Sequence, residues 1–97
     1  EIMEYEALGF AKRGEGWRLI DEGITDFYGS LPVNPSGGVL STNPIAATGL
    51  VRVAEAALQV MGKAEKRQVP DVNVALAHAW GGALQFHGLM ILSRDKG

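Results

Sequence analysis

Residues 33–49 read VNPSGGVLSTNPIAATG, and this stretch decides how the 97-residue chain is organised. It joins a turn signal and a glycine pair to a short apolar run, followed by Asn43 and Pro44. Asparagine is favoured at helix N-caps and proline at the first helical position, so we expect a helix over residues 44–61 that stops at Gly62. A polar side chain delivered to the positive end of a helix is well placed for binding or chemistry.

Apolar residues recur at helical spacing through this expected helix, and many of them are alanine. The predicted stripe consists of Leu50, Ala54, Ala57, Leu58 and Met61. The predicted polar edge consists of Arg52, Glu55, Gln59 and Lys63. A helix this apolar is expected to be buried on most sides, as in an interior layer of an α/β fold.

The chain before this stretch predicts short helices and loops. Residues 2–11 and 17–22 are helical in pattern, and residues 26–36 are rich in glycine, proline and asparagine, which predicts an irregular connection. Residues 39–40 predict a brief extended segment.

The chain after Pro70 predicts an antiparallel hairpin, with strands over residues 71–80 and 85–93 and a turn at Gly81 and Gly82. One face of the first strand carries larger side chains: Val72, Val74, Leu76, His78 and Trp80. The other face carries Ala75, Ala77 and Ala79, which would let a helix pack closely.

Composition excludes several classes of function. The net charge is −2 and neither half is strongly polarised, which argues against partners such as nucleic acid or an anionic membrane. There is no cysteine, so disulfides, thiolate metal sites and a local cysteine nucleophile are excluded within the chain. No apolar run approaches the roughly 20 residues that span a bilayer, and a cytoplasmic location is compatible with the sequence. Because Glu1 opens inside an apparent helix, we expect residues 1–97 to be a C-terminal fragment of a longer protein.

Four positions in the loop are candidate site residues, each with a purely structural alternative. The Asn43 amide could donate to a substrate carbonyl oxygen beside the helix end, or it could simply cap the helix. Ser36, Gly37 and Gly38 could let the backbone approach a ligand, or they could form only a tight turn.

His78 and His87 are the only imidazoles in the chain. His78 directly precedes the hairpin turn, where strand ends often carry sites, although a histidine in a strand is commonly a satisfied structural residue. Two histidines without a third ligand at suitable spacing make a weak case for a metal site, so none is predicted.

The combination of VNPSGG, Asn-Pro-x-x-x-Thr-Gly, a long helix and a glycine-turn hairpin resembles the final segment of the thiolase superfamily, closest to its archaeal and sterol-carrier-type branch. Thiolases typically read Asn-x-Asn-Gly-Gly and then Gly-His-Pro-x-Gly-x-Ser/Thr-Gly. The positions that match are Asn34, Gly37, Gly38, Pro44, Thr48 and Gly49. The positions that depart are Ser36, Thr42, Asn43 and Ala46, which stand where the family has asparagine, glycine, histidine and glycine.

The resemblance implies an α/β fold, the C-terminal part of a thiolase-like layered structure, and an acyl-CoA enzyme that makes or breaks a carbon–carbon bond next to a thioester. It implies that Asn43 takes the place of the catalytic histidine, that His78 supplies acid–base chemistry, and that Gly81 and Gly82 join the glycines of the loop in binding substrate. Coenzyme A would enter as part of the substrate, with no metal or redox cofactor. The remainder of the thiolase chain and further copies in a homo-oligomer would be the partners.

Asparagine donates hydrogen bonds but cannot take a proton near neutral pH. A second hypothesis is therefore a thiolase-fold subunit that no longer performs thiolysis and acts as a scaffold, a channelling partner or an aldolase-like relative. A third is an unrelated small α/β domain that matches the loop by chance.

Overall fold

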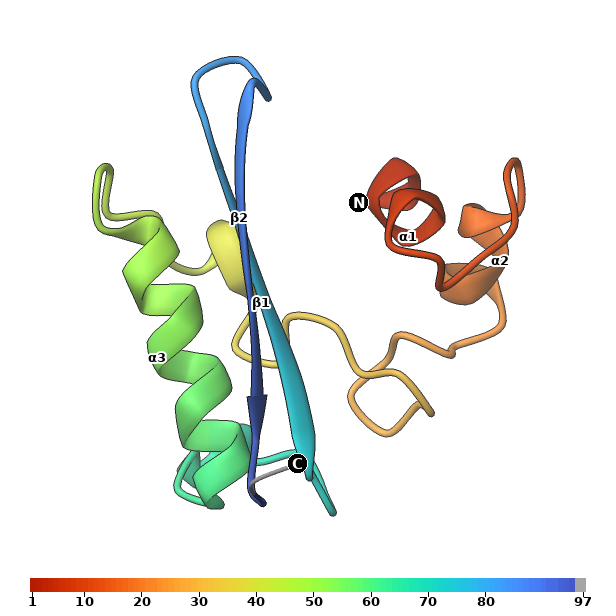
Figure 1. The fold of residues 1–97 in the computed structure, drawn as a ribbon. Coiled ribbons are helices and arrows are strands. Elements are labelled where there is room, and N and C mark those ends of the chain that lie inside the picture. The colour runs from red at the N-terminus through yellow and green to blue at the C-terminus, as the bar shows by residue number, and fades with distance from the viewer. Residues whose placement is uncertain (96–97) are drawn as a thin grey trace. The chain divides into compact units, whose positions relative to one another are not determined.

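The computed structural model describes residues 1–95, which fall into two compact units. The first unit spans Glu1–Val33 and contains α1 (Ile2–Ala7) and α2 (Gly16–Asp21), shown in Figure 1. The second unit begins at Asn34. No helix within residues 1–95 combines the length and apolar character needed to cross a membrane.

The two helices of the first unit approach each other closely. A Cβ atom on Gly16 would lie 2.5 Å from the carbonyl oxygen of Ile2, so only glycine fits there. The Gly16 backbone N–H donates to the Glu6 carboxylate at 3.1 Å. Backbone hydrogen bonds from Gly14 and Gly16 lower the pKa of Glu6 below its ordinary value, since they favour the charged form.

The helix predicted over residues 2–11 is too long. It ends at Ala7, and Gly9 then adopts a φ of +81°, a left-handed conformation that stops the helical path. The helix predicted over residues 17–22 is confirmed, shifted by one residue.

The second unit carries one long helix and one hairpin, with one single turn of 3₁₀ helix before the long helix and another after it. In chain order these are η1 (Gly38–Leu40), α3 (Thr48–Met61), η2 (Glu65–Arg67), β1 (Val74–Gly81) and β2 (Phe86–Ser93). The extended segment predicted at residues 39–40 is wrong, because positive φ angles at Gly37 and Gly38 curl the chain into η1.

α3 begins later than the sequence predicts, at Thr48, and ends as predicted at Gly62, whose φ of +70° forms a left-handed C-cap. The predicted apolar stripe is not the face that the helix buries: Leu50 is 74% exposed and Met61 57% exposed. The buried positions of α3 are Ala56, Gln59 and Val60.

The predicted antiparallel hairpin is confirmed, with β1 and β2 paired from Val74 opposite Ser93 to Gly81 opposite Phe86. The predicted start of the first strand at residue 71 is wrong, because Asp71 has a φ of +56° and β1 begins at Val74. The alanine face of β1 packs against α3, also as predicted: Ala77 is buried, and a Cβ atom on Gly49 of α3 would lie 3.1 Å from the Ala79 Cβ. Figure 1 shows α3 running along the hairpin. The opposite face exposes large apolar side chains within this chain, namely Val74, Leu76, Trp80, Leu89 and Ile91.

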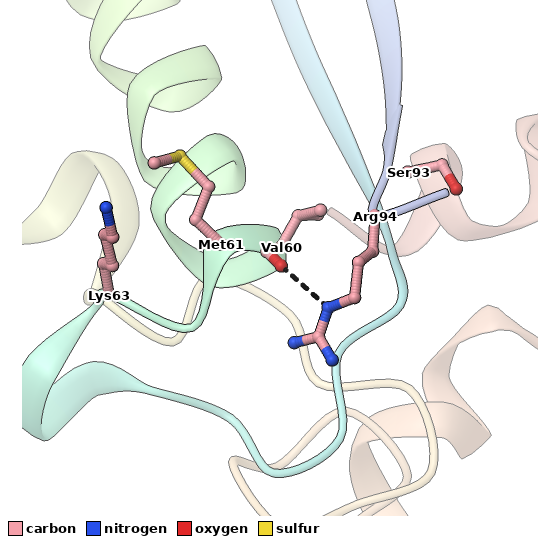
Figure 2. Close-up of a pocket in the computed structure, with 5 residues that line it drawn as sticks. All are labelled: Val60, Met61, Lys63, Ser93 and Arg94. Atoms are coloured by element: carbon pink, nitrogen blue, oxygen red, sulfur yellow. Dashed lines mark hydrogen bonds between the residues drawn. The ribbon is translucent and has the colours of Figure 1, made fainter. Parts of the chain in front are cut away.

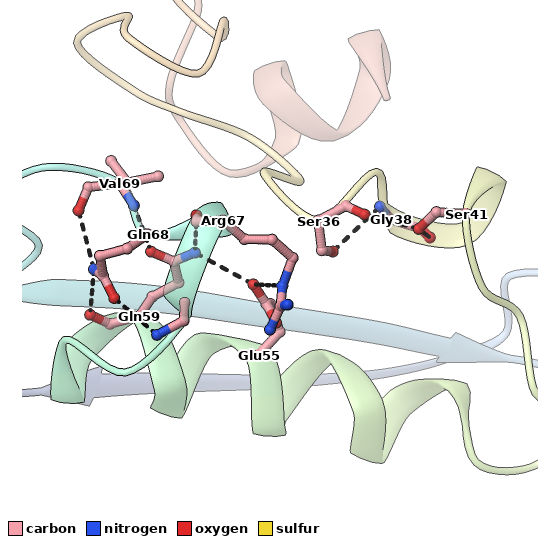
Figure 3. A network of polar contacts seen from close by, with 9 residues as sticks. Ser36, Gly38, Ser41, Glu55, Gln59, Arg67, Gln68 and Val69 are labelled. Carbon is pink, nitrogen blue, oxygen red and sulfur yellow. Dashed lines mark hydrogen bonds and ion pairs between the residues drawn. The ribbon is translucent and has the colours of Figure 1, made fainter.

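A buried glutamine ties α3 to the segment that follows it (Figure 3). Gln59 is only 4% exposed, and its Nε2 donates to the carbonyl oxygen of Arg67 at 2.6 Å and to Glu55 at 3.2 Å. Its Oε1 accepts from the backbone N–H of Val69 at 2.9 Å. Gln68 adds a bond from Nε2 to the Gln59 carbonyl oxygen. This position was predicted as part of a polar edge, but its polar atoms are satisfied by loop backbone rather than by water.

Candidate functional site

Asn43 lies in an exposed loop before α3 and not at the N-cap. Its Oδ1 accepts a hydrogen bond from the Thr48 hydroxyl at 2.7 Å, and the same hydroxyl lies 3.0 Å from the carbonyl oxygen of Pro44. Ala47 occupies the N-cap position and makes no side-chain cap. The predicted capping role of Asn43 and the predicted first-turn position of Pro44 are therefore wrong.

The reason is the backbone at Ala46, which has a φ of +72°. A left-handed residue breaks the helical path, so α3 cannot extend back to Pro44. This conformation suits glycine, because a Cβ atom at positive φ adds steric strain. The thiolase pattern has glycine at this place, so the structure gives a physical reason for that part of the pattern.

The Asn43 side chain is held through its oxygen, by the Thr48 hydroxyl. A hydroxyl has one hydrogen to donate, and the shorter distance assigns it to the Asn43 Oδ1. Within residues 1–95 the Asn43 Nδ2 makes no hydrogen bond, and the residue is exposed. The loop thus holds an amide by its oxygen and leaves its donors for another group.

Ser36, Gly37 and Gly38 form a tight turn stabilised by local hydrogen bonds (Figure 3). The Ser41 hydroxyl lies 2.8 Å from the Ser36 carbonyl oxygen and 3.0 Å from that of Gly38. A Cβ atom on Gly37 would lie 2.8 Å from the Ser41 Cβ, and one on Gly38 would lie 3.0 Å from the Asn34 Cγ. The turn itself accounts for both glycines.

His78 and His87 form a hydrogen-bonded pair on the hairpin. The His78 Nε2 lies 3.0 Å from the His87 Nδ1, and the His87 Nε2 lies 2.9 Å from the carbonyl oxygen of Leu84. The two ring planes differ by 7°. Trp80 stands directly opposite His87 in the ladder, so His78 and His87 are diagonal neighbours on one face.

Gly81 and Gly82 differ in their structural roles. Gly81 is still paired, opposite Phe86, as the last residue of β1. Gly82 has a φ of +64° and begins the turn of residues 82–85 that closes the hairpin. The turn therefore starts one residue later than predicted.

The start of α3 packs against the part of β1 that contains His78. Arg52 donates from Nη1 to the His78 carbonyl oxygen at 2.9 Å, and Gly49 faces Ala79. An apolar hollow lies between α3 and the hairpin, and it is lined by Gly49, Leu50, Val53, Ala77, His78, Ala79, Gly88, Leu89 and Met90. Because Ala77 and Ala79 face α3, the imidazole of His78 leaves the opposite face of the strand.

The candidate side chains therefore fall into two groups. Asn43 is paired with Thr48 at the entrance to α3, and His78 is paired with His87 on the far side of the hairpin. Both groups belong to the second compact unit. The apolar hollow between α3 and the hairpin is lined by His78 but not by Asn43.

A second hollow lies at the other end of α3 (Figure 2). It is lined by Val60, Met61, Lys63, Ser93 and Arg94, and the Arg94 Nε lies 3.4 Å from the Val60 carbonyl oxygen. A cation that donates to the last carbonyls of a helix stabilises the helix end. This hollow contains no predicted site residue.

Two residues of the site were missed by sequence reasoning. Thr48 was noted only as a match to the thiolase pattern, although its position five residues after Asn43 on a looped backbone gives it the contact. His87 was noted without a role, because pairing it with His78 requires the length of the turn. No group of three or more histidine, cysteine, aspartate or glutamate side chains within residues 1–95 is arranged to hold a metal ion.

Comparison with known proteins gives the family. The family model described as "Thiolase C-terminal domain-like" matches residues 1–94. Acetyl-CoA acetyltransferase of Methanothermobacter thermautotrophicus is 40% identical over 94 residues, which cover 96% of this chain and 24% of that protein. Sterol carrier protein 2 of Rattus norvegicus is 46% identical over 82 residues, covering 84% of this chain and 15% of that protein.

A third relative, the benzoylsuccinyl-CoA thiolase subunit BbsB of Thauera aromatica, is 36% identical over 84 residues, covering 84% of this chain and 22% of the subunit. The chain thus spans no more than about a quarter of these three relatives. The family match extends over both units, from α1 to the end of β2. This chain belongs to the thiolase C-terminal domain-like family.

Proposed function

We propose that this chain contributes the C-terminal part of the active site of a thiolase-like acyl-CoA enzyme, one that makes or breaks a carbon–carbon bond next to a thioester in the manner of acetyl-CoA C-acetyltransferase. The archaeal relative that carries this name aligns with 96% of the chain. In a longer thiolase chain, the residues outside this segment would supply the nucleophile and most contacts to coenzyme A.

The observation that carries the proposal is the Asn43 amide. It stands at the position of the family histidine, is held by the threonine of the same pattern, and has an unused Nδ2. A donor of this kind stabilises the negative charge that develops on a thioester oxygen during carbon–carbon bond formation or cleavage. The start of α3, which has no side-chain cap, adds the positive end of a helix nearby.

His78 is the proposed acid–base group, since Asn43 has no atom that takes a proton near neutral pH. The two side chains do not contact each other, and His78 leaves the hairpin face opposite α3, so each assignment is tested separately. Ser36, Gly37 and Gly38 are proposed to form one wall of the substrate pocket, and Gly81 and Gly82 another. No metal or redox cofactor enters this chemistry, because the thioester itself activates the reacting carbon. The active enzyme is proposed to be a homo-oligomer in the cytoplasm.

Replacement of Asn43 by alanine in the full-length protein tests the donor role. The expected result is a decrease in kcat/KM for acetyl-CoA condensation or thiolysis of about 100- to 1,000-fold, the range for losing one oxyanion donor. Asn43→Asp should be no better, because a carboxylate keeps the acceptor for Thr48 but offers no N–H. Asn73→Ala is the matched control, since Asn73 is also exposed and makes one weak bond within its own loop.

A fully active Asn43→Ala protein with a lowered melting temperature would assign Asn43 a structural role only. His78→Phe tests the second assignment: it should flatten one limb of the pH–rate profile, because the group that titrates is gone. An unchanged profile would remove His78 from the chemistry while leaving the role of Asn43 standing.

A second candidate function is that of a thiolase-fold subunit without thiolysis of its own. It is favoured by the asparagine at position 43 and by the relative that is named as one subunit of a thiolase. If the purified full-length protein shows no turnover with acetyl-CoA or longer acyl-CoA thioesters, but gains it when a partner subunit is added, this second function is the correct one.

A further inference from the structure

We propose that His87 is a positioning residue that fixes which ring nitrogen of His78 carries the hydrogen. The inference rests on the proposed acid–base role of His78 only for its catalytic consequence, and the geometry itself is independent of that role. Its basis is a chain of two hydrogen bonds, from His78 Nε2 to His87 Nδ1 at 3.0 Å and from His87 Nε2 to the Leu84 carbonyl oxygen at 2.9 Å.

The Leu84 carbonyl oxygen determines the direction of the chain. A carbonyl oxygen only accepts hydrogen bonds, so the His87 Nε2 must be the donor and must carry a hydrogen. In neutral His87 the Nδ1 then has a lone pair and no hydrogen. The only bond it can make to the His78 Nε2 is as an acceptor, so the His78 Nε2 carries the hydrogen and the His78 Nδ1 carries the lone pair.

The ring geometry supports a directional bond rather than face-to-face stacking. The planes differ by 7° while the ring centroids are 5.3 Å apart. With the two nitrogens 3.0 Å apart, the centroid distance exceeds the nitrogen distance by about one ring radius at each end. Two rings that meet edge to edge in nearly one plane have this relation, and it places the N–H in line with the lone pair.

The hairpin holds both rings in place. His78 and His87 lie on the same face of a continuous antiparallel ladder, which fixes their separation. Leu84 has a φ of +67° in the turn, a conformation that is costly for leucine and that accompanies the orientation of its carbonyl toward His87. Backbone strain in a turn that also fixes a side-chain tautomer is the pattern of a preorganised site.

The catalytic consequence is a defined proton path. When His78 acts as a base, its Nδ1 lone pair takes the proton from the reacting group, and the ring becomes an imidazolium. The His78 Nε2–H stays bonded to the His87 Nδ1, whose lone pair stabilises the new positive charge. When His78 acts as an acid, the same Nδ1 proton returns, so protons balance over one cycle and His87 remains neutral.

Nitrogen-15 NMR of the full-length protein with labelled histidine tests the assignment directly, at a pH where imidazoles are neutral. The expected result is a hydrogen on Nε2 of both His78 and His87. In His87→Phe the His78 ring should lose this single tautomer and show a mixture. In His87→Gln the His78 ring should keep its hydrogen on Nε2, because the glutamine amide oxygen takes the place of the His87 Nδ1 as acceptor. Gln85→Ala, in the same turn, should leave the spectrum unchanged.

A hydrogen on the His78 Nδ1 in the unmodified protein, or an unaltered His78 signal in His87→Phe, would overturn the proposal. If His87→Phe does not fold, the unmodified protein and His87→Gln still decide it. Activity separates the two proposals. His87→Phe should lower kcat by roughly 10-fold and His87→Gln by no more than about threefold. If His78→Phe is fully active, the acid–base role fails although the tautomer result stands.

Discussion

Replacement of Gln59 by alanine should destabilise the second unit far more than the loss of one polar side chain normally does. The Gln59 side chain makes three hydrogen bonds, two of them to backbone groups of the segment after α3. Alanine removes all three hydrogen bonds at once. Val69 is only 8% exposed, so water cannot reach its N–H to replace the lost acceptor. The Val69 N–H would remain buried without an acceptor.

The size of the effect follows from these contacts. An unsatisfied buried N–H costs about 1–3 kcal/mol, and each of the other two bonds contributes about 0.5–1.5 kcal/mol. The higher helix propensity of alanine returns about 0.4 kcal/mol. We therefore expect a loss of about 3 kcal/mol, equivalent to a roughly 100-fold faster exchange of the Val69 amide hydrogen if the segment opens locally.

The assay is amide hydrogen exchange of the full-length protein, combined with urea unfolding. Gln85→Ala is the matched control: Gln85 is an exposed glutamine whose Oε1 accepts one bond from Ala83, and its loss should change the unfolding free energy by less than about 0.5 kcal/mol. Gln59→Glu adds a second test. Its carboxylate keeps an acceptor for Val69 but turns an oxygen toward the Arg67 carbonyl, so at pH 7 it should be at least as harmful as alanine.

If Gln59→Ala and Gln85→Ala have equal effects, or if Gln59→Glu is tolerated at pH 7, the network does not hold the segment in the way described here.

Three further results are expected. Ala46→Gly should raise the unfolding free energy by about 0.5–1 kcal/mol in urea titrations, because glycine relieves the strain at φ +72° and loses part of that gain in chain entropy. Gly49→Val should lower it by about 1–3 kcal/mol, since the added carbons meet Ala79, while Gly49→Ala should be nearly neutral as helix propensity offsets a tight 3.1 Å contact. The pKa of Glu6 is lowered in the folded state by hydrogen bonds from Gly14 and Gly16. The stability that ionised Glu6 contributes is therefore fully present above the ordinary glutamate pKa and is lost as the pH falls through the lowered pKa of the folded state. Glu6→Gln should therefore reduce the acid sensitivity of α1 and α2, measured by hydrogen exchange between pH 3 and 6, and an unchanged acid profile would contradict this.

The hairpin and its packing face were predictable because they depend on local pattern. Alternation along β1 separates the alanines from the larger side chains, and small residues allow α3 to approach. The end of α3 was predictable for a similar reason, since Gly62 after an apolar helix is a strong stop signal.

The start of α3 was not predictable from the same kind of signal. Asn43 and Pro44 are good residues for a helix start, but the left-handed backbone at Ala46 overrides them, and alanine gives no sign of it. The one available hint was the glycine that thiolases carry at that position. The family resemblance thus contained backbone information that residue propensities lacked.

The histidine pair depended on cross-strand register, which short-range pattern leaves open. A turn starting at Gly81 instead of Gly82 shifts every cross-strand neighbour, and a shift of one residue moves His87 to the other face of the sheet. The burial of Gln59 was missed for a related reason: its partners come from a loop whose path is set by tertiary contacts.

The two-stranded sheet has a practical consequence for anyone who produces residues 1–97 separately. Each of its strands has one side whose N–H and C=O groups meet no neighbouring strand within residues 1–95, and Leu76, Leu89 and Ile91 are exposed beside them. Such a surface templates self-association into insoluble material. Residues 1–97 produced separately are therefore expected to require a solubility tag.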